Sequence, residues 1–504
     1  MNKLTGWIIN NVKEIRSEGD LAASIPFTIW QRQWEVCDIV ADRRSSEEIS
    51  RRVNRLSEKI PIYQIDAWYY QCVIAKYQAR YTKALELSRK GLEMAREKGD
   101  REKTALMHSL MGEACYNLSD YPKAIEHRLD ALAIYQSLGM EVRSGDVKGD
   151  IGLAYWRMGD NQQALDYYQQ ALDIYQKNND IRKMVSNKSN VAGALLRMDQ
   201  ADRAYDLYQE ALVLARQVGD VHKQSTILNN LGAILIRKGR YNEALARLQE
   251  GLKIDQTIGN ITGQASKMNN IGVLQGTLGN YDQSLEYLEK ALEIDISTGN
   301  INGQISKLSN IADLWALKED FKKAFDYSQR TVILSRQINS KAYLSHSLMR
   351  NVHLCVQMGV HQDAESYGLE GIALAEEIQS FSGLSMGLSN MADLYDALGQ
   401  PDKALEYSNR AIEMIANHST FEVALEKMYY RRYLILKKLG SQPEARESIE
   451  RAYQEVLKKA REITDPKELE RFYNNNKDNQ TIIREWEELE AARKGQPADA
   501  GRSQ

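Results

Sequence analysis

The amino-acid sequence predicts an all-α fold, a right-handed superhelical solenoid built from antiparallel helix pairs. The prediction rests on a forty-residue repeat of small side chains, on turn residues with the same period, and on apolar residues spaced three and four apart. The first series of small residues consists of Ala84, Ala124, Ala164, Ala204, Ala244, Ala324, Ala364 and Ala404, with Ser284 at one position and Ala445 one residue late. A side chain kept small once per period marks a close approach of two backbones, so each period forms one unit stacked on the next.

A second series of small residues follows the first by seven positions, which is about two helical turns. It comprises Ala131, Ala171, Ala211, Gly251, Ala291, Thr331, Gly371, Ala411 and Ala452. Both series therefore lie on one face of the same helix, where a larger side chain would push the neighbouring helix away. A third series belongs to the preceding helix and comprises Gly112, Gly152, Ala192, Gly232, Gly272, Ala312 and Ala392.

Two turns divide each period into two helices. Residues that tolerate the left-handed conformation at a helix end share one phase, namely Gly99, Gly139, Asn179, Gly219, Gly259, Gly299 and Asn339. Residues able to cap a new helix follow them, namely Asp100, Asp180, Asp220, Asn260, Asn300 and Ser340. The other turn carries Gly159, Gly239, Gly279, Gly359 and Gly399. We therefore expect two antiparallel helices of similar length in each period.

Apolar spacing and proline both favour helices over strands. Leu228, Leu231 and Leu235 follow one another at intervals of three and four. The prolines within the array fall where the second helix of a unit begins, a position that accepts proline at little cost; they are Pro122, Pro401 and Pro443.

One period shows the combined pattern most clearly, through Asn230-Leu231-Gly232, Leu235, Gly239, Tyr241, Ala244 and Gly251. This pattern resembles the tetratricopeptide repeat family over roughly residues 67–460, in about ten units. The family's typical unit has about 34 residues, whereas the forty-residue unit is similar to those of kinesin light chains, Pins-type spindle adaptors and bacterial peptide-sensing regulators. The resemblance implies a recognition scaffold for a protein or peptide, and it does not name the ligand.

We expect four segments along the chain. They are an N-terminal helical cap over 1–66, the solenoid over 67–460, C-terminal capping helices over 461–494 and a disordered tail over 495–504. The aromatic residues Trp7, Trp30 and Trp34 suit a cover for the first repeat, and a partner-docking module is the alternative.

Charge and cysteine content limit the classes of partner. The 66 basic and 69 acidic residues nearly cancel, so we expect no nucleic acid and no membrane as bulk electrostatic partners. The scattered cysteines are expected to be reduced, and the first residues show no long apolar run. These features predict a cytoplasmic protein, and nothing in the sequence sets its oligomeric state.

The resemblance implies that the first helix of each unit lines a concave groove. Helical spacing from Asn230 then gives the candidate peptide-binding residues, which are Trp156, Arg157, Ser189, Arg197, Asn229, Arg237, Asn269, Ser309 and Asp313. Three of them form an arginine ladder with one guanidinium per unit, namely Arg157, Arg197 and Arg237. Guanidinium groups suit carboxylates, and amides and hydroxyls pair with peptide backbone, so an acidic peptide is the expected ligand.

Other interpretations apply to the same residues. An arginine near a helix end also interacts with the helix dipole, and exposed charges are commonly only solvated. Farther along the groove, Asp313, Asp393 and Asp396 predict an acidic second half. We expect a further set of asparagines to form hydrogen bonds between helices, namely Asn190, Asn230, Asn270, Asn310 and Asn390.

Two groups of residues match catalytic or metal-binding patterns, but neither has the surroundings that such a site needs. Gly383-Leu384-Ser385-Met386-Gly387 matches a hydrolase nucleophile motif in letters but falls inside a predicted helix rather than between a strand and a helix. The set His346, His353, His361 and Cys355 lacks the remaining ligands of a metal site. The sequence therefore predicts no enzyme, no cofactor and no metal.

Two functions remain open. The first is a non-catalytic protein–protein interaction scaffold that binds a peptide or protein segment in its concave groove. The alternative is a regulatory or sensor subunit of a separately encoded protease or kinase.

Overall fold

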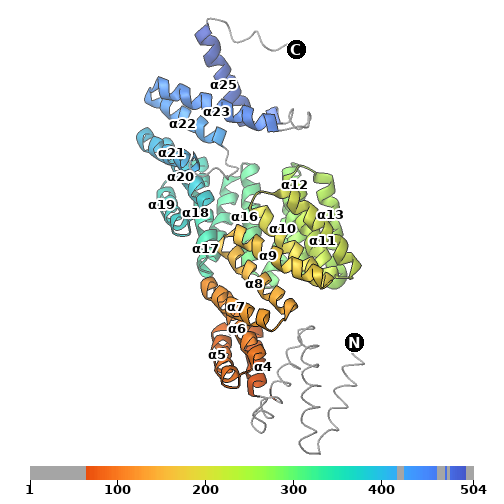
Figure 1. Cartoon of the computed structure of the whole chain (residues 1–504). Coiled ribbons are helices and arrows are strands. Elements are labelled where there is room, and N and C mark those ends of the chain that lie inside the picture. Colours follow the sequence, from red (N-terminus) through yellow and green to blue (C-terminus); the bar gives the residue numbers. More distant parts are fainter. Residues whose placement is uncertain (1–50, 52–63, 417–424, 463–471, 474–476, 495–504) are drawn as a thin grey trace, which may run out of the picture. The chain divides into compact units, whose positions relative to one another are not determined.

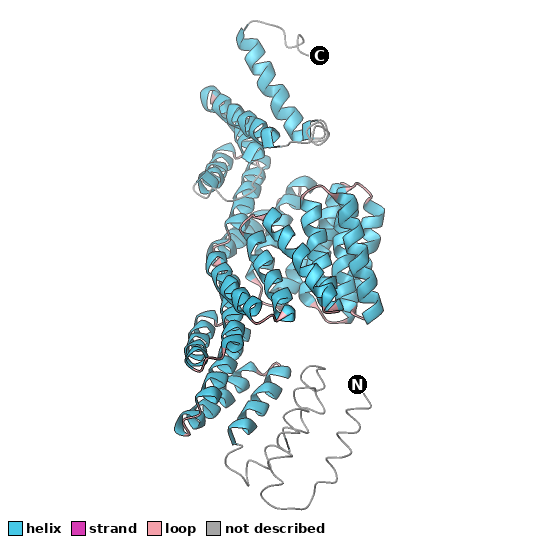
Figure 2. Cartoon of the chain, turned by 45° about the vertical axis from the view of Figure 1, so that its right-hand side comes forward, coloured by secondary structure: helices cyan, strands magenta, loops and turns pink. Residues whose placement is uncertain are grey.

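The computed structural model describes residues 51, 64–416, 425–462, 472–473 and 477–494. Every regular element in this part of the chain is an α-helix, and consecutive helices pair in order from α4 with α5 to α22 with α23 (Figures 1 and 2). The predicted all-α array of helix pairs is therefore confirmed. Within the described ranges, no helix combines the length and apolar character needed to cross a membrane.

The chain forms two compact units, and the division between them falls inside one helix, after Ile254. The helices up to that division are α4 (Gln64–Tyr77), α5 (Tyr81–Glu97), α6 (Arg101–Asn117), α7 (Tyr121–Ser137), α8 (Glu141–Met158), α9 (Asn161–Lys177), α10 (Ile181–Arg197), α11 (Ala201–Gln217), α12 (Val221–Arg237) and α13 (Tyr241–Ile258), which contains it. The second unit continues with α14 (Ile261–Thr277), α15 (Tyr281–Ser297), α16 (Ile301–Leu317), α17 (Phe321–Gln337), α18 (Lys341–Met358), α19 (Ala364–Glu377), α20 (Phe381–Ala397), α21 (Pro401–Ala416), α22 (Leu425–Leu439), α23 (Gln442–Glu462) and α25 (Lys477–Lys494).

The turns between helices repeat one backbone geometry. After α5, the N–H of Asp100 donates to the carbonyl of Ala95 at 2.9 Å and the N–H of Gly99 donates to that of Arg96 at 3.0 Å. These two bonds form a Schellman motif, in which Gly99 adopts the left-handed conformation with φ 67°. Asp100 then caps α6 by accepting a hydrogen bond from the Lys103 N–H at 3.0 Å. The predicted helix ends and caps are thus confirmed.

Several turns lack the glycine or asparagine on which the prediction relied. Their left-handed residues are Ala79, Ser119, Asp199, Glu319 and Gln379, with φ between 52° and 63°. A side chain in this conformation costs about 1–2 kcal/mol. The hydrogen bonds of the two flanking helices therefore set the turn, and glycine only lowers its cost.

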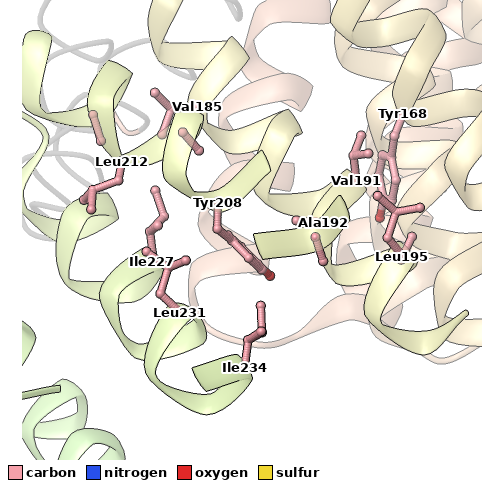
Figure 3. Packing of buried hydrophobic residues seen from close by; sticks show 14 of the residues in the cluster. Tyr168, Val185, Val191, Ala192, Leu195, Tyr208, Leu212, Ile227, Leu231 and Ile234 are labelled. Carbon is pink, nitrogen blue, oxygen red and sulfur yellow. The ribbon is translucent and has the colours of Figure 1, made fainter. Parts of the chain in front are cut away.

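The small residues lie where helices approach most closely. A Cβ added to Gly232 on α12 would lie 2.6 Å from the Leu248 side chain on α13. Ala164, Ala204 and Ala211 are fully buried in the first unit's largest core cluster. Figure 3 shows side chains of this cluster from neighbouring helices lying side by side. Ser284 takes the place of alanine in the first series of small residues. Its buried hydroxyl donates to the Gly272 carbonyl at 2.6 Å, so this additional polar group has a hydrogen-bond partner.

The predicted terminal segments are only partly described. The N-terminal segment 1–66 lies outside the described residues except for residue 51 and residues 64–66. In the C-terminal segment, α25 buries Ile482 completely and stacks Trp486 on Tyr453 of α23, with ring centroids 5.8 Å apart. This helix covers the apolar face of the last helix pair, as a cap would. The tail 495–504 is outside the described residues.

Candidate functional site

The predicted groove residues all lie on the first helices of their pairs. In the first unit, α8 carries Trp156 and Arg157, α10 carries Ser189 and Arg197, and α12 carries Asn229 and Arg237. In the second unit, α14 carries Asn269, and α16 carries Ser309 and Asp313.

Two arginines flank one indole ring in the first unit. The Arg197 guanidinium lies 3.6 Å from the ring centroid of Trp156, and the Arg157 guanidinium lies 5.3 Å from it. Both distances fall within the range of a cation–π interaction. Trp156 is partly buried, whereas both arginines are exposed. We call these three residues the Arg–Trp–Arg cluster.

The arginines of this cluster make hydrogen bonds to neutral groups one repeat earlier in the chain. Arg157 Nε donates to the Tyr116 hydroxyl at 2.9 Å, and Arg197 Nη1 donates to the backbone carbonyl of Trp156 at 2.9 Å. The bond to Tyr116 raises the pKa of Arg157, while burial and the nearby charge of Arg157 lower the pKa of Arg197. The cluster therefore holds two positive charges close together, and the described groups that act on the two arginines include no carboxylate.

The third residue of the ladder differs. Arg237 forms an ion pair with Asp199, 3.3 Å away in the preceding repeat's turn. Two other groove candidates of the first unit, Ser189 on α10 and Asn229 on α12, are partly buried. The Ser189 hydroxyl donates to the Val185 carbonyl of its own helix at 2.9 Å. The ladder thus contains two guanidinium groups on neutral partners and one on a carboxylate.

Amides link consecutive repeats in the second unit. Asn310 Nδ2 donates to Asn269 Oδ1 at 2.8 Å, and Asn390 Nδ2 donates to the Met349 carbonyl at 2.9 Å. In the first unit Asn230 bonds the buried Tyr208 hydroxyl. Hydrogen bonding between helices is therefore confirmed for these three asparagines, whereas Asn190 is exposed. Asn269, a groove candidate, takes part in this inter-repeat network.

Arginine replaces asparagine at the same position farther along the second unit. Arg350 Nε and Nη2 bond the two carboxylate oxygens of Asp313 at 2.7 and 3.2 Å, and its Nη1 lies 3.4 Å from the Ser309 hydroxyl. The Arg350 side chain is only 10% exposed, against 58% for Asp313. The predicted groove residues Ser309 and Asp313 therefore meet a guanidinium from the next repeat.

The next pair of repeats shows the same contact. Arg431 bonds the Ser389 hydroxyl and lies 3.0 Å from the Asp393 carboxylate, and Lys438 bonds Asp396 at 2.7 Å. Burial raises the pKa of Asp393 to about 6. Each aspartate of the predicted acidic half is thus paired with a cation, which lowers the net negative charge expected there.

Sequence reasoning did not identify Arg350 and Arg431. A signal was available, because Arg350 follows Asn310 by one period and so occupies the position of the interhelical asparagines. In the second unit, Asn310, Arg350 and Asn390 at this position each bond a residue of the preceding first helix.

The structure also locates residues of the catalytic and metal-binding patterns that the sequence analysis rejected. Ser385 lies buried within α20, so it is not on the strand-to-helix turn that a nucleophile of that class needs. His346 and His353 lie on α18, where burial and the charges of Arg350 and Arg431, respectively, lower the pKa of each imidazole. Cys355 is buried in an apolar cluster, and burial raises its thiol pKa to about 11.

Comparison with known proteins identifies the repeat. Tetratricopeptide repeat models match residues 103–177, 184–257, 268–295 and 388–418. None of the curated proteins compared matches the chain significantly.

Solved structures similar to this chain include a bacterial quorum sensor. The quorum sensor NprR from B. thuringiensis is 14% identical, with a TM-score of 0.50 over 70% of this chain and 99% of that one. A Rap protein complexed with competence and sporulation factor is 15% identical, with a TM-score of 0.48 over 72% of this chain and 98% of that one. A putative kinesin light chain from P. anserina is 14% identical, with a TM-score of 0.35 over 39% of this chain and 97% of that one.

The family matches, the helix pairs and the buried small residues agree in register. The matched segments of this chain therefore are tetratricopeptide repeats, and the helix pairs recur with forty residues per unit.

Proposed function

We propose that the chain is a non-catalytic scaffold that binds an acidic peptide or protein segment along the first helices of its repeats, with the Arg–Trp–Arg cluster as the anchor. The observation that supports this most strongly is the pair of guanidinium groups on Trp156 whose described partners are a hydroxyl and a backbone carbonyl. Two like charges held this close attract an anion, and guanidinium groups bind carboxylates by paired hydrogen bonds.

Other arginines on the first helices support this choice by contrast. Arg237, Arg350 and Arg431 each contact an aspartate of the preceding repeat. A ligand carboxylate at those positions would have to compete with a carboxylate already present. At Arg157 and Arg197 it would replace only neutral partners, so we assign the main ligand contact to these two residues.

The ladder geometry sets the ligand's spacing. Packed helices lie about 8–10 Å apart, and an extended peptide advances about 3.3 Å per residue. Each repeat therefore meets about three peptide residues. Acidic side chains at every third position would match Arg157 and Arg197.

A peptide array tests the proposal directly. Peptides with Asp or Glu at every third position are titrated against the full chain, with the same peptides in Asn and Gln form as the neutral comparison. Hydrogen bonds to charged groups contribute roughly 1.5–3 kcal/mol each, so Arg157→Ala combined with Arg197→Ala should weaken binding by about two orders of magnitude or more.

Arg216 provides the matched control. It lies on the second helix α11 and pairs with Glu250 at 2.5 Å, so Arg216→Ala removes the same charge from a position outside the predicted groove. Full affinity in the folded Arg157→Ala/Arg197→Ala variant would refute the groove assignment, as would equal losses in the Arg216→Ala control.

The natural partner distinguishes the scaffold from the alternative. Pulldown with mass spectrometry from native extract should recover several proteins that share an acidic segment. Recovery of a single protease or kinase in fixed stoichiometry would favour a regulatory or sensor subunit of that enzyme instead.

A further inference from the structure

A compact group of possible metal ligands lies on α6 and α7 of the first unit. It consists of His108 on α6 together with His127 and Asp130 on α7, each offering one ligand atom, and these atoms lie within 4.8 Å of one another. Within the described residues, this is the group of His, Cys and carboxylate side chains with the spacing to hold an ion.

His108 is buried inside this group. Its side chain is 4% exposed, and its Nδ1 atom has no hydrogen-bond partner although the Asp130 carboxylate lies 3.3 Å away. His127 Nδ1 is likewise buried without a hydrogen-bond partner, and the two imidazole rings lie 5.7 Å apart, centroid to centroid. A buried polar atom without a hydrogen-bond partner raises the free energy of the folded state. A bound metal ion would give these two nitrogen atoms a partner.

We propose that His108, His127 and Asp130 bind one divalent transition-metal ion of the zinc class. Zinc takes imidazole nitrogen and carboxylate oxygen at about 2.0–2.2 Å, usually with tetrahedral geometry. Two such donors then lie roughly 3.3–3.5 Å apart, a separation that His108 Nδ1 and Asp130 already have. The third donor, on the partly exposed His127, lies within 4.8 Å of the other two, so it would have to approach them by at most about 1.5 Å to reach the separation of two zinc ligands.

The helical positions and charges suit this role. His127 and Asp130 are three residues apart and therefore point to the same side of α7. Burial lowers the pKa of both histidines and so favours the neutral imidazole, which is the form that binds metals. With three protein ligands, the ion keeps a fourth position for water.

Arg96 on α5 disfavours metal binding at His108. Its Nη2 atom lies 3.2 Å from His108 Nε2. Donation to Nε2 places the imidazole proton on Nδ1, the nitrogen that would have to bind the metal. Because Arg96 is exposed, it can move aside when the ion binds, and its removal should strengthen metal binding.

The sequence prediction of no metal considered only histidines of the second unit. The present group joins two helices, and the spacing of His127 and Asp130 becomes informative only when His108 is known to face them. A bound ion would join α6 to α7 within one repeat.

Titration of the chelator-treated full chain with ZnCl2, and with CoCl2 as a spectroscopic probe, tests the site. We expect one saturable equivalent and the visible absorption of four-coordinate Co²⁺. Asp130→Asn and His127→Gln, which alter partly exposed side chains, should each weaken binding at least tenfold. Arg96→Ala should strengthen it.

His222→Ala is the matched control, because His222 is an exposed histidine on α12 outside the group, and this variant should bind as the unmodified chain does. The inference is overturned if no saturable equivalent binds, or if Asp130→Asn and His127→Gln both retain full affinity while remaining folded.

Discussion

Ala215 and Asp255 occupy the same position in successive repeats, one in each unit, yet their surroundings differ in polarity. In the first unit Ala215 on α11 and Ile227 on α12 are both fully buried in one apolar cluster. In the second unit the equivalent residues are Asp255 and Lys267, an ion pair with 2.7 Å between its charged atoms. Both partners are buried, with side chains 0% and 4% exposed.

The backbone around the two positions is the same. Gln224 donates to the Ala215 carbonyl at 3.2 Å, and Gln264 donates to the Asp255 carbonyl at 3.3 Å. The following repeat again carries a buried ion pair, between Asp295 and Lys307 at 2.9 Å. One helix-pair geometry therefore accepts either an apolar filling or a buried pair of charges.

Local changes accompany the charged filling. The Asn260 side chain, which caps α14, also donates to Asp255 Oδ1 at 2.9 Å. Gly263 leaves room for this carboxylate, because a Cβ at that position would lie 2.4 Å from Asp255 Oδ2. The first unit has Lys223 at the position of Gly263. The ion pair thus depends on an asparagine and a glycine as well as on its two charges.

The largest expected effect comes from removing one charge of the pair. Asp255→Ala leaves Lys267 buried without its carboxylate, so we expect a loss of about 3–5 kcal/mol. Urea unfolding, with hydrogen exchange of α14 amides as a local probe, measures it. A loss below about 1 kcal/mol would mean that Lys267 escapes to water.

A close-packed position should respond equally in both units. Ala211→Leu in the first unit and Ala291→Leu in the second overpack fully buried positions of the same series. Each should cost about 1–3 kcal/mol, measured as the shift in urea midpoint. Unchanged midpoints in both variants would show that these faces are not close contacts, and unequal shifts would show that the units differ in packing as well as polarity.

The effect on stability of replacing Gly303, the glycine beside the Asp295–Lys307 ion pair, should depend on whether that pair is present. Gly303→Ala places a Cβ 2.3 Å from both Asp295 Oδ2 and Asn300 Nδ2, which opposes the roughly 1 kcal/mol that alanine gains over glycine in a helix. We expect net destabilisation in the unmodified chain and a smaller loss in the Asp295→Ala/Lys307→Ile background, where only the contact with Asn300 remains. A double-mutant cycle measures this coupling, and additive effects would contradict it.

The smallest loss of stability should come from converting the charged site into the apolar one. Asp255→Ala with Lys267→Ile reproduces Ala215 and Ile227, and replacing a buried ion pair by apolar groups is often neutral or stabilising by about 1–4 kcal/mol. Thermal and urea unfolding of the double variant check this. A loss as large as that of Asp255→Ala alone would show that the pair is needed for more than charge balance.

The sequence predicted the fold well because its evidence is repeated many times. A single alanine means little, but Ala164, Ala204 and Ala244 in one phase demand a common close contact. Side-chain pairing is less accessible, because it depends on which way a long side chain turns. Arg237, for example, shares its phase with Arg157 and Arg197, yet it contacts a carboxylate where they contact neutral groups.

The buried ion pair of Asp255 and Lys267 in the second unit is likewise hard to predict from the sequence. In the sequence, Asn260 carries the signal of a helix cap and does not by itself indicate a buried carboxylate. The sequence does repeat the pattern, since Asp295, Asn300 and Gly303 follow with the same spacing. Recognising an ion pair there requires knowing that both charged positions face the interior, which only the packed helices establish.

The contacts that link one repeat to the next also bear on how such a chain can change length during evolution. Arg157 to Tyr116, Arg197 to Trp156 and Asn310 to Asn269 all span 41 residues. Duplication or loss of a whole forty-residue period therefore presents each of these side chains with the same position of a neighbouring period. An insertion of any other length would shift donor and acceptor out of phase. The reach of a few side chains thus favours growth and shortening of the array by complete repeats.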